Sequence, residues 1–357
     1  MSHFIGFLKE LGVKYLFSIC LSITTIFFIS PSYSKESPVL NIGFGSCAKQ
    51  ENPQPIWQAI AAKNPDLFIM MGDNVYIDSD DPKVMKDSYN MLAANPNFTK
   101  FRNETPIMAT WDDHDYGSQD GGKEFSGKYD AKSAFVEFFD YPEVNLLATK
   151  DQGIFHSREL SFKGKTIRII MLDTRWYRDK QQFTYLSYEQ LKKLNLGRYQ
   201  PHKDASKTVL GATQWKWLEE TLAKPSDLNI IVSGFPMISG FSGWETWANF
   251  PHERKRLLAL IEKYSVSNSI VLSGDIHRGE MSSLKLNDNT LYEITSSGLD
   301  AKIYPANVNE NRYGEAVIRK NFGLLSIKLD EQGDLVVSGG LFDEQGQEQL
   351  NIVMNIK

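Results

Sequence analysis

The chain has 357 residues, of which 41% are hydrophobic and 23% are charged, a balance typical of a folded globular protein. Its formal net charge of −5 excludes a global positive field able to hold nucleic acid or an anionic membrane. We therefore expect no obligate nucleic-acid partner, and any recognition of phosphate must come from a local site or a metal.

The amino-terminal segment has the composition of an export signal. Lysines precede an uncharged apolar run over 15–29, and Ser32-Tyr33-Ser34 follows with small residues where a signal peptidase cuts. The run is shorter than the roughly 20 residues of a membrane span, although a retained membrane anchor stays the alternative. We expect a signal peptide over 1–34 and an exported protein, periplasmic or extracellular. The mature domain would cover 35–357, without a stable membrane partner.

Short apolar runs recur along the rest of the chain, with helical segments between them. Such runs are typical of strands covered on both faces, and their alternation with helices indicates an α/β layered core. The sequence predicts buried strands over 39–44, 66–71, 106–110, 166–172, 228–232 and 269–272, and helices over 56–63, 213–222 and 252–264. It also predicts a long loop over 115–130, and later strands over 290–295, 321–329, 335–339 and 349–356 that complete the sheets.

Four of the predicted strands are followed by side chains that can bind a metal. In chain order these are Cys47, then Asp73 with Tyr76, then Asp113 with His114, and finally Asp275 with His277. In layered α/β proteins, polar site residues collect at the carboxyl ends of strands. A two-metal site needs such a set, with a bridging carboxylate, further oxygen and nitrogen ligands, and a histidine near the leaving group.

Cys47 is the one cysteine of the predicted mature chain, so it belongs to no internal disulfide. Two interpretations remain open for it. A lone cysteine is often a small buried apolar residue. The alternative is a thiolate that binds a metal, which the neighbouring motifs favour.

Six segments between residues 40 and 280 carry a family resemblance. They are Gly45-Ser46-Cys47, Gly72-Asp73-Asn74-Val75-Tyr76, Trp111-Asp112-Asp113-His114-Asp115, Leu172-Asp173-Thr174-Arg175, Leu210-Gly211-Ala212-Thr213-Gln214-Trp215-Lys216-Trp217-Leu218 and Ser273-Gly274-Asp275-Ile276-His277. In this order they resemble the alkaline phosphatase D (PhoD-like) family of calcineurin-like metallophosphoesterases. The resemblance implies an α/β (α+β) fold, a four-layer αββα sandwich, and a cluster of Fe³⁺ and Ca²⁺, with other divalent metals left open.

The resemblance also implies a role for each metal-capable residue. Cys47 and Tyr76 would bind the iron together with Asp73 and Asp275, and Asp73 would also bridge to the second metal. Asp113 and His277 would complete the cluster. A thiolate and a phenolate suit a ferric ion, and carboxylates suit a hard cation.

The chain departs from the family pattern at three places. Asn74 stands where the family has a tyrosine after Gly-Asp, and it is an additional candidate for the site together with Gln119 and Asp120. A metal-reaching asparagine of the family is replaced by the stretch Gly117-Ser118-Gln119-Asp120. Either Gln119 or Asp120 takes its place as a ligand, or the second metal is held differently. The histidine that the wider superfamily places after the strand ending at Ser233-Gly234 is absent from the sequence.

The expected activity is that of an exported phosphoesterase, an alkaline phosphatase or phosphodiesterase, in which a metal-held hydroxide attacks phosphorus in line. His114 would donate a proton to the leaving oxygen. Arg175 would clamp the phosphate, or would instead form a structural salt bridge with Asp173. Only a phosphate-ester substrate is expected as a partner, and the oligomeric state is left open.

Two alternatives remain for the activity and one for a loop. The enzyme would act on cell-envelope phosphodiesters, as a phosphodiesterase or phospholipase, or the chain would be a non-catalytic binding protein on the same fold. Substrate selectivity is expected in the loops after Asp115 and around 241–250. For the two aromatics of Trp244-Glu245-Thr246-Trp247, we favour core or lid packing over contact with substrate.

Overall fold

The computed structural model of the chain describes residues 38–139 and 151–356, so the predicted signal peptide lies outside the described residues. Thirteen strands are described. Their bounds are β1 (Leu40–Gly45), β2 (Leu67–Met71), β3 (Ile107–Thr110), β4 (His156–Phe162), β5 (Lys165–Met171), β6 (Leu228–Ser233), β7 (Ser269–Ser273), β8 (Gly279–Leu286), β9 (Asn289–Ser296), β10 (Arg312–Val317), β11 (Asn321–Leu329), β12 (Leu335–Asp343) and β13 (Glu348–Ile356). They form one sheet in the order β13-β12-β11-β1-β2-β3 and a second in the order β10-β8-β9-β7-β6-β5-β4.

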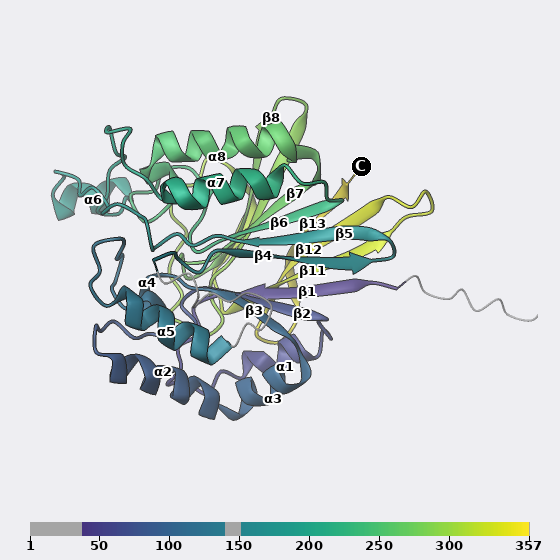
Figure 1. Cartoon of the computed structure of the whole chain (residues 1–357), viewed down its shortest axis with the longest axis horizontal. Helices are drawn as coiled ribbons and strands as arrows, with labels where there is room; N and C mark the ends of the chain where they lie inside the picture. The colour runs from purple at the N-terminus through teal and green to yellow at the C-terminus, as the bar shows by residue number, and fades with distance from the viewer. Residues whose placement is uncertain (1–37, 140–150, 357) are drawn as a thin grey trace, which may run out of the picture. The chain divides into compact units, whose positions relative to one another are not determined.

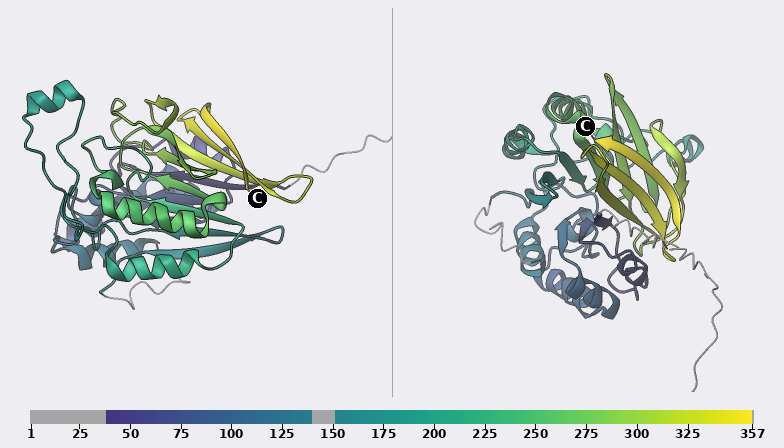
Figure 2. Two further views of the ribbon diagram at one scale, coloured as in Figure 1. Left: turned by 90° about the horizontal axis from the view of Figure 1, so that it is seen from above. Right: turned by 90° about the vertical axis from the view of Figure 1, so that its right-hand side faces the viewer.

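Helices cover the outer face of each sheet. Their bounds are α1 (Ile56–Ala61), α2 (Pro82–Ala94), α3 (Pro96–Glu104), α4 (Asp113–Tyr116), α5 (Lys128–Phe139), α6 (Tyr188–Leu194), α7 (Gly211–Leu222) and α8 (Pro251–Tyr264). Helices α1, α2, α3 and α5 lie on one side of the strands, and α7 and α8 lie on the other (Figure 1). The right-hand view of Figure 2 also shows the two helical groups on separate sides of the strands. None of the helices in the described ranges is long and apolar enough to cross a membrane.

Three apolar cores separate the four layers, and strand β2 shows how the sequence produces them. Successive side chains of a strand point to opposite faces. Phe68 and Met70 therefore pack against α1, α2 and α3, whereas Leu67, Ile69 and Met71 join the core between the two sheets. The third core lies between the second sheet and helices α7 and α8. The predicted four-layer αββα sandwich is confirmed.

The parallel strands fix where the loops meet. Strands β1, β2 and β3 are parallel to one another, as are β5, β6, β7 and β9, so each set sends its carboxyl ends to one edge. The late strands join both sheets, as expected, because β11 pairs antiparallel with β1 and β8 pairs antiparallel with β9.

Several elements were not predicted. Helices α2 and α3 begin at Asp-Pro and Asn-Pro steps, where Asp81 and Asn95 cap them. The buried face of α2 includes Ser88 and Tyr89 beside Met85 and Leu92, which weakens its apolar signal. The predicted loop over 115–130 is also shorter than expected, because its first residues end α4 and its last residues begin α5.

Helix α7 is positioned by one buried carboxylate on helix α8. Glu253 Oε2 accepts hydrogen bonds from Thr208 Oγ1 (2.6 Å), Val209 N (2.8 Å) and Trp215 Nε1 (2.8 Å) at the start of α7. In the same first turn of α7, Gln214 donates to the carbonyl of Asp173 (2.8 Å) and accepts from its amide (2.9 Å). Helix α7 thereby holds the turn that follows β5, next to the acidic end of the sheets.

Replacing Glu253 with alanine should lower the free energy of unfolding by about 3 kcal/mol, because several buried donors lose their acceptor together. Urea unfolding measures this loss as a lower midpoint. Glu220→Ala is the matched control, since Glu220 lies on the exposed face of α7 with a long ion pair to Lys216 (3.9 Å), and it should change stability by less than about 0.5 kcal/mol. Equal effects of the two substitutions would show that Glu253 does not anchor α7.

Candidate metal centre

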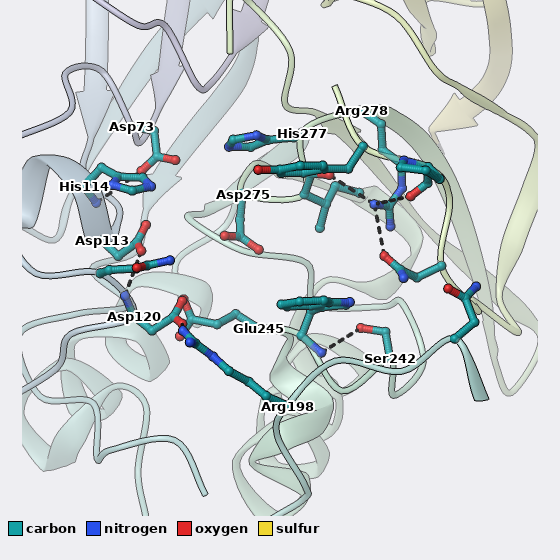
Figure 3. A pocket seen from close by; sticks show the side chains of 17 residues that line it. Asp73, Asp113, His114, Asp120, Arg198, Ser242, Glu245, Asp275, His277 and Arg278 are labelled. Carbon is teal, nitrogen blue, oxygen red and sulfur yellow. Dashed lines mark hydrogen bonds and ion pairs between the residues drawn. The ribbon is translucent and has the colours of Figure 1, made fainter. Parts of the chain in front are cut away.

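The metal-capable side chains of the two sheets meet at the carboxyl ends of their parallel strands. Cys47 follows β1, Asp73 follows β2, Asp113 follows β3, and Asp275 and His277 follow β7. Figure 3 shows Asp73, Asp113, Asp275 and His277 around one cavity, with His114 beside them. The chain order of the motifs predicted this convergence.

Four overlapping groups of ligand atoms result, and within each group the atoms lie within 4.8 Å of one another. These groups are Cys47 with Asp73 and His277, Asp73 with Asp113 and His114, Asp112 with Asp113 and Asp275, and Asp113 with Asp120 and Glu245. Tyr76 joins the first group, because its hydroxyl lies 3.2 Å from His277 Nε2. All six predicted metal residues therefore lie in one continuous cluster.

Strained backbone carries four of these residues. Cys47, Asp73, Asp275 and His277 have φ angles of 64°, 51°, 75° and 54°, in the left-handed region that L-residues other than Asn and Asp seldom adopt. Such conformations cost about 1–3 kcal/mol each and cluster at functional sites. Hydrogen bonds hold them in place, including Ala48 N to the carbonyl of Asp73 (2.9 Å) and His277 N to Ser297 Oγ (2.7 Å).

A glycine makes the Asp73 turn possible. Gly72 has a φ of 105°, and a Cβ at this position would lie 2.5 Å from Cβ of Asp112. The Gly-Asp pair after β2 is therefore required by the close approach of the β2 and β3 ends. This contact brings Asp73 next to the Asp112-Asp113 pair.

The thiol of Cys47 is buried among polar groups. Its Sγ lies 3.0 Å from Ser297 Oγ and 3.4 Å from Asp73 Oδ2. Burial raises the pKa of the Cys47 thiol to about 11, although the hydrogen bonds from Ser297 and Ser46 oppose that shift. A bound cation would reverse this preference, because metal ligation requires the thiolate.

The carboxylates of the cluster lack enough positive charge nearby. Burial, followed by repulsion from neighbouring acids, raises the pKa of Asp73, Asp112 and Asp275 well above the ordinary range. Within 38–139 and 151–356, the Asp275 carboxylate makes no hydrogen bond or ion pair, and Asp112 Oδ2 is a buried atom without a partner. Oxygen, nitrogen and sulfur donors that converge in this way fit a cluster of cations.

Arg175 does not occupy the predicted position of a phosphate clamp. Its side chain is 0% exposed, and its Nε lies 2.6 Å from Asp112 Oδ1 while its Nη2 lies 2.7 Å from Glu245 Oε2. The expected salt bridge with Asp173 is also wrong, because Asp173 Oδ1 accepts the backbone amide of Arg175 (2.9 Å) and not its guanidinium. The buried guanidinium of Arg175 thus forms ion pairs with two carboxylates and offsets part of the negative charge of the acidic cluster.

His114, the predicted proton donor, lies at the edge of the cluster. It lines the cavity, its Nδ1 lies 2.7 Å from Asp78 Oδ1, and its ring packs on Tyr76 with centroids 4.2 Å apart. Burial alone would lower the pKa of His114. The carboxylates of Asp73, Asp113 and Asp78 have the larger, opposite effect and raise this pKa to about 11.

The three additional candidates have different surroundings. Gln119 and Asp120 line the cavity, and Asp120 bonds Arg198 and Tyr199. Asn74 does not line it, and its amide nitrogen donates to the carbonyl of Thr110 (2.8 Å) and to Asp115 Oδ2 (2.5 Å). Asn74 therefore joins the end of β2 to β3, and its position outside the cavity wall does not support a role as a metal ligand. Its Oδ1 has no hydrogen-bond partner in the described ranges.

The cavity beside the acidic cluster has a volume of about 470 Å³. Its wall includes side chains that the sequence motifs did not indicate. They are Asn195, Arg198, Ser242, Trp244, Glu245, Arg278, Tyr304 and Asn307. Of these, Ser242, Trp244 and Glu245 lie in the loop around 241–250, where the sequence analysis expects substrate selectivity.

Comparison with known proteins identifies relatives of this arrangement. The sequence model of the PhoD-like phosphatase family matches residues 42–341. Alkaline phosphatase D of Bacillus subtilis (strain 168) is 22% identical over 312 residues, which cover 75% of this chain and 50% of that protein. The chain thus spans about half the length of this curated relative.

Solved structures share the fold. A structure of PhoD superposes with a TM-score of 0.67 at 14% identity, covering 90% of this chain and 72% of its own. GAP50, the anchor in the inner membrane complex of Plasmodium, gives a TM-score of 0.55 at 15% identity, covering 89% of each chain. A dimetal phosphatase from Danio rerio gives 0.54 at 11% identity, covering 90% of this chain and all of its own (100%).

The matched region 42–341 contains all six residues of the predicted metal cluster, and it supplies strands to both sheets. Because this region makes up most of the chain and carries the site, the chain belongs to the PhoD-like phosphatase family.

Proposed function

We propose that the protein is an exported, metal-dependent phosphoesterase that hydrolyses phosphate esters, as an alkaline phosphatase or phosphodiesterase. The observation that supports this most strongly is the continuous cluster of thiol, phenol, imidazole and carboxylate donors beside a cavity. Family membership supports the same class of reaction. Export by cleavage after Ser34 is part of the proposal, and the mass of the mature amino terminus tests it.

Two kinds of cation fit the donor set. Cys47 and Tyr76, with Asp73 and Asp275, would hold Fe³⁺, because thiolate and phenolate are strong donors to a ferric ion. Asp113 and His277, together with Asp73, would hold a second ion, for which we propose Ca²⁺. When bound, such ions neutralise charge on phosphoryl oxygens and lower the pKa of water.

The chain itself supplies proton transfer and positioning. The Asp78 carboxylate lies 2.7 Å from His114 Nδ1. This contact fixes the orientation of the imidazole ring and favours the protonated imidazolium. In the described part of the chain, His114 Nε2 has no hydrogen-bond partner, so it is available to protonate the leaving oxygen of a bound ester. Arg175 holds Asp112 and Glu245 behind the cluster and acts as a positioning residue.

Fold alone does not separate an enzyme from a binding protein. The likeness to GAP50, described as an anchor, illustrates this for the αββα sandwich. The converging donor atoms favour catalysis here, because a binding protein has no need to keep the carboxylates of Asp73, Asp113 and Asp275 together beside a cavity.

Replacing Cys47 with serine should abolish iron binding and activity while the protein stays folded. The new hydroxyl lies near Ser297 and Asp73, so it finds polar partners, and we expect a loss of unfolding free energy of only about 1 kcal/mol. Iron content and the visible absorption expected of a Tyr76-bound ferric ion report the metal, and urea unfolding reports the fold.

Ser46→Ala is the matched control, because it removes a neighbouring hydroxyl, 3.3 Å from Cys47 Sγ, without removing a candidate ligand. It should keep its iron and its colour. A Cys47→Ser protein with a full complement of iron and near-normal turnover would contradict the ligand assignment.

Replacing His114 with alanine should slow the hydrolysis of alkyl phosphates by about 100- to 10,000-fold, because an alkoxide needs a proton as it leaves. Nitrophenyl phosphate should lose far less, since nitrophenolate leaves unprotonated. The ratio of kcat/KM values for the two esters measures the effect, and Asp78→Asn should give a smaller change in the same direction. Equal losses on both esters would rule out His114 as the proton donor.

A further inference from the structure

The cavity is larger than the phosphoryl group requires. Its volume of about 470 Å³ falls in the range of sites that enclose a whole small molecule. The acidic side, with Asp73, Asp113 and Asp275, would face the phosphoryl group and its metals. The remaining wall therefore has room for the alcohol part of an ester.

Two aromatic side chains of this wall are exposed. Trp244 is 45% exposed and Tyr304 is 46% exposed, and both line the cavity from different loops. The neighbouring Trp247 is 0% exposed and packs in the core with Trp215 and Phe235. Trp247 therefore packs in the core, as expected, whereas the ring of Trp244 lies outside the core and contributes to the cavity wall.

The Trp244 indole is held by two loops that touch through glycines. Gly197 N donates to the carbonyl of Ser242 (2.9 Å), and Tyr199 N donates to that of Gly243 (2.8 Å). A Cβ on Gly197 would lie 2.3 Å from the Gly243 oxygen and 2.6 Å from Cδ2 of Trp244. The indole therefore rests directly against the Gly197 backbone, which fixes its position at the cavity wall.

Tyr304 is held beside the metal cluster. Its ring stacks on that of His277, with centroids 5.0 Å apart and an interplanar angle of 8°, and its backbone amide donates to the His277 carbonyl (3.1 Å). Because His277 is a candidate ligand, the Tyr304 ring lies next to the place where an ester oxygen would bind. The ammonium of the exposed Lys302 lies 5.5 Å from the centroid of the Tyr304 ring.

Polar groups border the same wall. Asn307 Oδ1 accepts from Arg278 Nη1 (3.3 Å), which leaves the amide nitrogen of Asn307 able to donate. Asn195 offers a second amide, and it adjoins the loop that supports Trp244. An apolar flat surface with amides at its edge is suited to a planar ring that carries polar substituents.

We propose that Trp244 and Tyr304 form a subsite for a flat aromatic ring in the alcohol part of the ester, so that the preferred substrates are phosphate esters of ring-bearing alcohols. This inference rests on the proposed phosphoesterase function. Nucleosides and benzyl-type alcohols belong to this class, whereas simple alkyl or polyol phosphates do not.

The test compares benzyl phosphate with cyclohexylmethyl phosphate. The leaving alcohols of the two esters have similar basicity and rings of similar size. The main difference between the esters is that the benzyl ring is flat and aromatic and the cyclohexyl ring is not. The purified, metal-loaded protein should prefer benzyl phosphate in kcat/KM by about tenfold, as aromatic stacking predicts. Trp244→Ala should bring the ratio close to one, because the benzyl ester loses stacking in addition to the apolar contact that both esters lose, and Trp244→Phe should restore part of the preference.

Tyr185→Ala is the control, because Tyr185 is an exposed aromatic (94%) that does not line the cavity. Calorimetric binding of benzylphosphonate and cyclohexylmethylphosphonate gives a readout independent of turnover. Hydrolysis of both esters with no preference, or equal losses on both in Trp244→Ala, would overturn the subsite and leave the phosphoesterase function standing. Binding of benzylphosphonate that depends on Trp244, without hydrolysis of either ester, would overturn the phosphoesterase function and support the subsite. If the protein neither hydrolyses the esters nor binds benzylphosphonate through Trp244, both the function and the subsite are overturned.

Discussion

Repulsion among buried and half-buried carboxylates is the constraint on which this end of the molecule depends. The ends of β2, β3 and β7 bring Asp73, Asp112, Asp113 and Asp275 together, and burial strengthens the repulsion between them. Arg175 offsets part of it, since its guanidinium contacts both Asp112 and Glu245. Burial alone would raise the pKa of Glu245, but Arg175 and Arg178 lower it to about 2. Asp275 has no comparable partner in the described ranges, so the fold holds an acidic cluster that cations would complete.

The same constraint explains why the strained turns persist. The left-handed backbone at Cys47, Asp73, Asp275 and His277 aims donor atoms at one region, and each turn is held by hydrogen bonds to neighbouring strand ends. Two sheets with parallel strands supply those ends at one edge, and apolar cores on both faces of each sheet fix their spacing. The surrounding packing and hydrogen bonds thus hold these backbone conformations, which would be unfavourable in an isolated turn.

The sequence predicted the part of the site that depends on local signals. Asp73 and Asp275 each follow an unbroken apolar run, so their positions could be inferred from chain order and parallel strands. Arg175 could not be interpreted in this way, because its partners Asp112 and Glu245 are 63 and 70 residues away. Trp244 and Trp247 look alike in sequence, and only tertiary packing buries one and leaves the other at the cavity.

If the acidic cluster holds cations, Asp275→Asn should change the stability of the protein in opposite directions without and with metal. The substitution removes one charge from the cluster, so in a chelator it should raise the urea midpoint of the metal-free protein above that of the wild type. With Fe³⁺ and Ca²⁺ present, the wild type should gain stability through binding, and the variant should gain much less and fall below it. A variant that is less stable than the wild type in both conditions, or one that binds both metals as tightly, would contradict the account.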